Sequence, residues 1–194
     1  MFGGKLIKTN DDDNSFKSMN NEKGAKILAT GSSSCIFQPN IPCLNSKDKV
    51  DNTKISKIVY GKKSDRYLQQ EKKMNNLIKK ISGYNEWALI YDKFCKAPLY
   101  GNILKHYDKD IIKCMDDYYE QKFNETNNMM IGLYGGDTFE DYFVKKVLNN
   151  SKNIDKPMYN LLVKMKPLFF GLNELYNNGL SHLDIKINNI VLHD

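Results

Sequence analysis

The stretch that decides the fold lies near the end of the printed sequence: Ser181-His182-Leu183-Asp184-Ile185-Lys186-Ile187-Asn188-Asn189-Ile190-Val191-Leu192. Its polar residues follow the spacing H-x-D-x-K-x-x-N. A carboxylate, an ammonium and an amide on one short loop can all be aimed at a single point. The apolar run that closes the stretch, Ile190 to Leu192, predicts a strand directly after the loop.

This spacing resembles the catalytic loop of the eukaryotic-type serine/threonine protein kinase family. In that family the Asp meets the substrate hydroxyl, the Lys stabilises the transferring phosphoryl group and the Asn holds magnesium. The resemblance implies that Asp184 and Lys186 are catalytic, that Asn189 is a metal ligand, and that ATP and Mg are cofactors. His182 would brace the loop. Leu183 stands where the family usually has Arg, so control through a phosphorylated activation loop is not expected.

A second segment, Lys26 to Phe37, reads as a strand, a turn of small residues and another strand. It is similar to the hairpin that covers the nucleotide phosphates in kinases, where small residues let backbone N–H groups approach the phosphate oxygens. The ATP-binding positions implied by this alignment are Ala29, Gly31, Ser32, Ser33, Ser34 and Ile36. Only one of the family's three glycines is kept, and a plain surface hairpin is the alternative interpretation.

Two charged residues stand out because apolar neighbours surround them in the expected elements. Lys57 shares one face of a strand near Thr53 to Tyr60 with apolar residues. Glu71 falls on the apolar stripe of a helix that begins near Ser64. An isolated buried carboxylate is costly, and a Lys57–Glu71 pair, as in the kinase family, would resolve both positions and direct the Lys to the α- and β-phosphates.

Two more strands are expected, one at Trp87 to Tyr91 and one at Met129 to Gly136. In kinases the second leads into the hinge whose backbone binds adenine, which makes Tyr134 and Gly135 the implied hinge residues. A short helix near Ile111 to Tyr119 is also expected, without a functional interpretation.

The last third of the chain predicts helices. Asp137 opens the first of them with an acidic cap. A long amphipathic helix then covers Met158 to Asn178, kinked by Pro167 and ended by Asn178-Gly179.

These elements predict an α+β fold. Residues 25–135 would form a kinase-like N-terminal lobe with an antiparallel sheet and one helix. Residues 136–194 would begin a helical C-terminal lobe that is incomplete after the catalytic loop, and residues 1–24 would be a flexible arm. The sequence pattern G-S-S-S-C-I-F-x-P is most similar to that of kinases from large nucleocytoplasmic DNA viruses.

The printed residues contain no D-F-G segment, which supplies the second magnesium ligand in the family. The resemblance therefore implies transfer of the ATP γ-phosphate to a protein hydroxyl if that segment and the rest of the lobe are supplied, and weak or no activity without them. One alternative is a catalytically dead binding module that docks a protein through its exposed C-terminal helix face. The other is a phosphotransferase for small molecules on the same lobe.

Composition limits the partners. The net charge is +6, and all basic residues except Arg66 are Lys, which indicates solvated surface rather than specific nucleic-acid binding. No apolar run reaches the ~20 residues of a membrane span. The cysteines Cys35, Cys43, Cys95 and Cys114 have no metal-site spacing and predict free thiols in a reducing compartment. A cytoplasmic location is expected, in the host cytoplasm or virion if the protein is viral.

Overall fold

The computed structural model describes residues 25–31, 34–61, 63–98 and 127–192. The expected N-terminal arm and the expected helix near residues 111–119 lie outside these ranges. The described residues have an α+β fold with a five-stranded sheet. The chain divides into two compact units, which are described separately below. Of the described residues, 25–68 and 92–132 belong to the sheet unit, and 69–91 and 133–192 belong to the helical unit, with the gaps given above.

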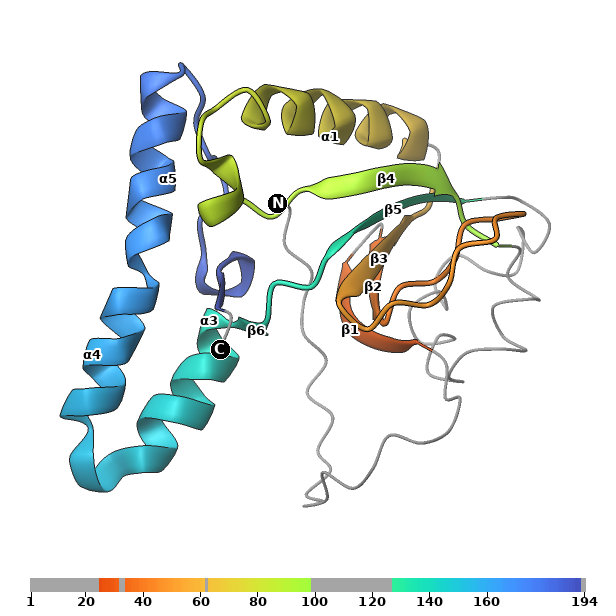
Figure 1. Cartoon of the computed structure of the whole chain (residues 1–194). Helices are drawn as coiled ribbons and strands as arrows, with labels where there is room; N and C mark the ends of the chain where they lie inside the picture. The colour runs from red at the N-terminus through yellow and green to blue at the C-terminus, as the bar shows by residue number, and fades with distance from the viewer. Residues whose placement is uncertain (1–24, 32–33, 62, 99–126, 193–194) are drawn as a thin grey trace. The chain divides into compact units, whose positions relative to one another are not determined.

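The five strands run in the order β1-β2-β3-β5-β4 (Figure 1). Their bounds are β1 Lys26–Gly31, β2 Ser34–Gln38, β3 Lys54–Val59, β4 Tyr91–Lys96 and β5 Asn128–Leu133. The expected strand at residues 87–91 is wrong, because β4 only begins at Tyr91. Gly83 takes a left-handed φ of 70° and starts the 3-10 helix η1 (Tyr84–Glu86), and the Trp87 N–H closes it by donating to the Tyr84 carbonyl.

One face of the sheet carries the core of the sheet unit. Cys35 pairs with Ile58 across β2 and β3, and Phe37 lies two residues along on the same face. All three side chains are fully or almost fully buried, and they pack with Ile41 and Met129. Successive side chains of a strand point to opposite faces, so Ser34, Ile36 and Gln38 of β2 lie on the face opposite the core.

A disulfide joins Cys43, in the loop before β3, to Cys95 in β4. The described residues contain no free cysteine. The expectation of free thiols is therefore wrong for Cys35, Cys43 and Cys95. The bridge lies beside a backbone hydrogen bond of 2.8 Å from the Leu44 N–H to the Lys96 carbonyl, and beside the Lys93–Asp48 ion pair. The loop is thus attached to β4 by a covalent bond, a backbone hydrogen bond and a charge pair.

Helix α1 (Ser64–Ile78) begins where the sequence predicts. Asp65 in its first turn accepts a 2.6 Å hydrogen bond from the Asn128 amide in β5, and its carboxylate lies 3.7 Å from the Lys96 ammonium of β4. An acidic group in the first turn also suits the positive end of the helix dipole. These contacts fix the start of α1 against two strands of the sheet.

The helical unit contains short strands and a series of helices. In chain order they are β6 Asp137–Thr138, α3 Phe139–Tyr142, the π-helix η4 Phe143–Val147, the 3-10 helix η5 Leu148–Asn153, α4 Asp155–Lys164, α5 Lys166–Asn177, the 3-10 helix η6 Ile187–Asn189 and β7 Val191–Leu192. Tyr142, Val147, Leu161 and Leu192 form its buried core. Thr138 caps α3 by accepting from the Asp141 N–H at 3.2 Å. The cap is thus one residue later than the expected Asp137.

The expected long helix is two helices, α4 and α5, that follow one another along the chain (Figure 1). The break falls at Met165, and Pro167 lies in the first turn of α5, where its missing N–H costs nothing. Asn178 caps the C-terminus, and Gly179 takes a left-handed φ of 68°, as the Asn-Gly pair predicts. Among the described residues, no helix is both long and apolar enough to cross a membrane.

Replacing Gly171 with Ala in α5 is expected to destabilise the protein. Helix propensity alone predicts a gain of about 1 kcal/mol. However, a Cβ on Gly171 would lie 2.5 Å from the Trp87 ring, and a fused ring cannot bend away as a flexible chain end can. Overpacking of this kind costs roughly 1–3 kcal/mol or more, so the clash should outweigh the propensity. Urea unfolding should show a lower midpoint, and an unchanged or higher one would contradict the packing.

Candidate functional site

The sheet unit brings together five of the ten residues predicted to contact ATP. Ala29 on β1 pairs with Ile36 on β2, and Ile36 pairs with Lys57 on β3. Directly paired residues share one face of an antiparallel sheet. Gly31 pairs with Ser34 two positions further along, beyond Thr30 and Cys35, and so on the same face as Ala29 and Ile36. These five residues therefore lie in two adjacent rows on the face opposite the core.

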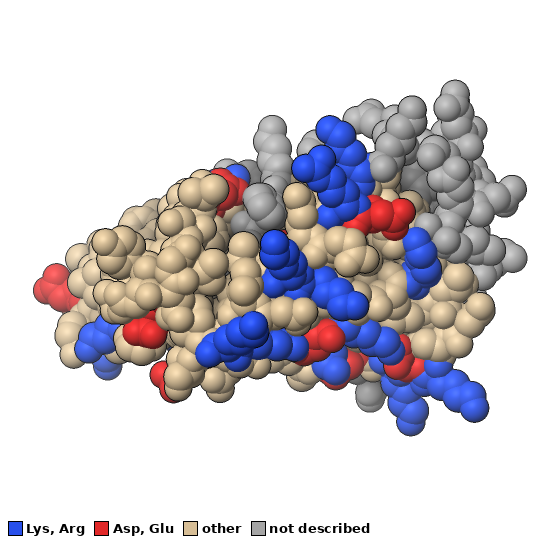
Figure 2. Space-filling model, turned by 90° about the horizontal axis from the view of Figure 1, so that it is seen from above, with Lys and Arg blue, Asp and Glu red and all other residues tan. Residues whose placement is uncertain are grey.

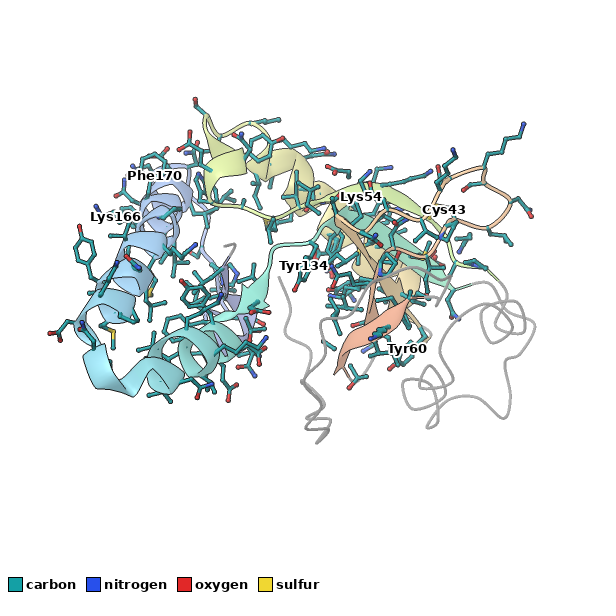
Figure 3. All side chains as sticks on the ribbon, turned by 60° about the horizontal axis from the view of Figure 1, so that its bottom comes forward. Cys43, Lys54, Tyr60, Tyr134, Lys166 and Phe170 are labelled. Atoms are coloured by element: carbon teal, nitrogen blue, oxygen red, sulfur yellow. A yellow bond between two sulfur atoms is a disulfide. The ribbon has the colours of Figure 1, made fainter. Side chains whose placement is uncertain are left out.

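Ser32 and Ser33 lie outside the described residues. The end of β1 is held by a contact that the sequence did not suggest. The Tyr60 hydroxyl donates a 2.9 Å hydrogen bond to the Gly31 carbonyl. Tyr60, shown in Figure 3, directly follows β3 and packs against the core of the sheet unit. Tyr60 therefore fixes the backbone at the last residue of β1.

Lys57 is 2% exposed, although it bears a charge. Its ammonium donates a 2.7 Å hydrogen bond to the Tyr67 hydroxyl and lies 4.9 Å from the centre of the Tyr67 ring. A buried ammonium is stable only where such partners replace water. The sequence could not reveal this contact, because a Tyr on an apolar helix stripe is usually only a packing residue.

Glu71, the predicted partner of Lys57, is also buried. It follows Tyr67 by four residues in α1, so the two side chains lie on one face of that helix. Burial raises the pKa of Tyr91, and the Glu71 charge raises it further. The Lys57–Glu71 pair itself stays a prediction, since Glu71 belongs to the helical unit and Lys57 to the sheet unit.

The predicted hinge residues, Tyr134 and Gly135, follow β5. Burial raises the pKa of Tyr134, and the nearby Asp137 raises it further. A Cβ on Gly135 would lie 2.0 Å from Leu89 and 2.5 Å from Val191. Gly135 is therefore required by close packing within the helical unit. A role in binding adenine stays a prediction.

The catalytic-loop residues converge on one carboxylate in the helical unit. The Asn189 amide donates to the Asp184 backbone carbonyl at 2.7 Å and to its Oδ2 at 2.9 Å. The Lys186 ammonium lies 3.2 Å from the same Oδ2. Asn189 is 8% exposed, whereas the Asp184 and Lys186 side chains are 37% and 49% exposed. The loop thus has a buried amide beneath two charged groups that a ligand can reach.

Backbone pairing fixes the position of this loop. The β6 and β7 strands pair with Asp137 opposite Leu192 and Thr138 opposite Val191, and the Phe139 N–H donates to the Ile190 carbonyl at 2.8 Å. β7 forms within the apolar run after the loop, as predicted. Its Leu192 is buried in the core of the helical unit. The loop is therefore held on its C-terminal side by a strand and a packed side chain.

The pKa of His182 is expected to lie below its ordinary value of 6.5, since burial lowers it and the Asp184 charge only partly opposes this. The Asp184 N–H donates to His182 Nδ1 at 3.3 Å, which requires that nitrogen to be unprotonated. A lowered folded-state pKa gives stability above pH 6.5 that is lost as the pH falls through the lowered value. An NMR titration of the His182 ring should find this midpoint, and a midpoint above 6.5 would contradict the contact.

A magnesium site must be assembled from few protein groups. The described residues contain no cluster of three or more His, Cys, Asp or Glu side chains suited to a metal. Mg²⁺ often takes one or two carboxylates and completes its shell with phosphates and water. Both side-chain hydrogen bonds from Asn189 to Asp184 are donated by Nδ2, which leaves Oδ1 as an acceptor. Asn189 therefore fits a metal ion that arrives with phosphates and water, and not a complete protein cage.

Comparison with protein-family models gives no match to this chain, and comparison with curated proteins gives none either. The resemblance to protein kinases therefore depends on the motif residues and their order. It stays a prediction, as does the finer similarity to viral kinases.

The face drawn in Figure 2 gives no clear preference for one charge of partner. On the face drawn in Figure 2, Lys and Arg are interspersed with Asp and Glu. The large side chains Phe169, Phe170 and Tyr176 of α5 are exposed; Figure 3 labels Phe170. A protein partner on this helix face stays a prediction.

Proposed function

We propose that the protein is a phosphotransferase of the serine/threonine protein kinase type that uses Mg·ATP. The observation that carries the proposal is the convergence of Lys186 and Asn189 on the Asp184 carboxylate. A buried Lys57 beside a hairpin of small residues supports it, because such a hairpin and an ammonium are suited to phosphate groups.

In the proposed reaction Asp184 accepts the proton of a Ser or Thr hydroxyl. The hydroxyl oxygen forms a bond to the γ-phosphorus, and the bond from that phosphorus to the bridging oxygen of ADP breaks. Lys186 stabilises the charge on the phosphoryl group during transfer, and Asn189 would hold the metal together with the phosphates. Bound with the phosphates, Mg²⁺ would neutralise part of their charge.

Lys57 has a separate task in this proposal. Its ammonium would bind the α- and β-phosphates, while Ala29, Gly31 and Ile36 border the nucleotide on the same face of the sheet. In this proposal the sheet unit would bind phosphates, and the catalytic loop of the helical unit would act on the acceptor.

Binding of Mg·ATP and of adenosine by calorimetry tests this proposal. Lys57→Met keeps an unbranched side chain in the buried position but removes the charge. It should weaken Mg·ATP binding roughly 10–100-fold, the size of a lost hydrogen bond to a charged group, and leave adenosine binding unchanged.

Lys54→Met is the matched control. Lys54 lies on the same strand, but its ammonium is paired with Asp51 at 3.6 Å near the surface. This variant should bind Mg·ATP as the wild type does. Absence of Mg·ATP binding by the wild type, or equal affinities for the wild type and Lys57→Met, would refute the proposal.

A further inference from the structure

The contact between Lys57 and Tyr67 involves two parts of the phenol side chain. The hydroxyl oxygen accepts from the ammonium at 2.7 Å, and the ring centre lies 4.9 Å from the same nitrogen. Both residues belong to the sheet unit. The ammonium is therefore held by a hydrogen bond and by attraction to a ring face.

Such a contact matters more for Lys than for most side chains. The ammonium is a compact charge on a flexible four-carbon stem, so its direction depends on its partners. Asp65, in the first turn of the same helix, accepts a 2.6 Å hydrogen bond from Asn128 of β5, which holds the part of α1 that carries Tyr67 against the sheet. Contacts thus run from the sheet through the start of α1 to the Lys57 ammonium.

We infer that Tyr67 is a positioning residue that directs the Lys57 ammonium toward the phosphates of a nucleoside triphosphate. This inference depends on the proposed function. An ammonium has three donors, so one hydrogen bond to the Tyr67 oxygen does not prevent another to a phosphate oxygen. Lys57 also lies in the row of Ala29 and Ile36, on the face where the nucleotide is proposed to bind.

Two substitutions separate the parts of the contact. Tyr67→Phe removes the hydroxyl and keeps the ring, whereas Tyr67→Leu removes both. The dissociation constant for Mg·ATP should rise about 3–10-fold in Tyr67→Phe and further in Tyr67→Leu. Adenosine, which has no phosphates, should bind all three proteins equally. Tyr84→Phe, a half-buried tyrosine in η1, is the matched control and should leave both constants unchanged.

The outcomes distinguish the inference from the function on which it depends. If the wild type binds Mg·ATP and Tyr67→Phe binds it equally well or more tightly, the positioning role is refuted and the proposed function stands. Equal losses for Mg·ATP and adenosine in Tyr67→Phe would show general damage to the fold and would also refute the role. If the wild type does not bind Mg·ATP, the proposed function fails and the inference fails with it.

Discussion

Asp184→Asn should reduce phosphoryl transfer by roughly 10²–10⁴-fold, the usual contribution of a general base. The amide cannot accept the proton of the acceptor hydroxyl. It also replaces one carboxylate oxygen with a donor, which disturbs the contacts with Lys186 and Asn189. The measurement is the rate of γ-phosphate transfer from ATP to a protein acceptor.

The control for this variant is Asp155→Asn, the same change at an exposed position in the first turn of α4. It should transfer phosphate as fast as the wild type. The Mg·ATP affinity of Asp184→Asn should be measured alongside, because the loss is expected mainly in the rate of transfer. Equal rates for the wild type and Asp184→Asn would contradict the role of the carboxylate.

Loss of the Cys43–Cys95 disulfide is expected to cost roughly 2–4 kcal/mol of the free energy of unfolding. The bridge closes a loop with a sequence separation of 52, so it removes much of the freedom of the unfolded chain. Cys43 is also part of the buried core of the sheet unit. Urea unfolding of Cys43→Ala, Cys95→Ala and the double variant measures this cost.

The wild type and the three variants form a double-mutant cycle, which tests whether Cys43 and Cys95 are bonded to each other. Either single substitution already breaks the bond, so the double variant should be little less stable than each single one. Peptide mapping without reductant should recover residues 43 and 95 in one linked pair. Two small, additive losses, with both thiols open to alkylation in the unfolded protein, would contradict the disulfide.

Local chemistry allowed parts of the fold to be predicted from the sequence. Ser64 with Asp65 and Asn178-Gly179 mark helix ends through their own caps and backbone preferences, and the structure has these ends where expected. Pro167 was expected to kink one long helix, but it lies in the first turn of a second helix. Contacts between distant segments could not be predicted. No local pattern joins Cys43 to Cys95, and only the register of three strands places Lys57 beside Ile36.

The strand faces illustrate the same limit. Alternation predicted that β3 is apolar on at least one face and could not show that Ser56, Lys57, Ile58 and Val59 are all buried. Packing on both sides of a strand removes the polar face from which alternation is recognised. The disulfide likewise removes the basis on which a reducing compartment was expected, because such bonds are typical of oxidising environments.

The most direct test of a kinase-type function follows the labelled γ-phosphate of ATP. The chain should be expressed with any residues that its gene encodes after position 194 and mixed with Mg²⁺ and a protein rich in Ser and Thr. We expect label on Ser or Thr of the protein with the wild type, and almost none with Asp184→Asn. Label that reaches only a small molecule, or reaches protein equally with both forms, would contradict the account.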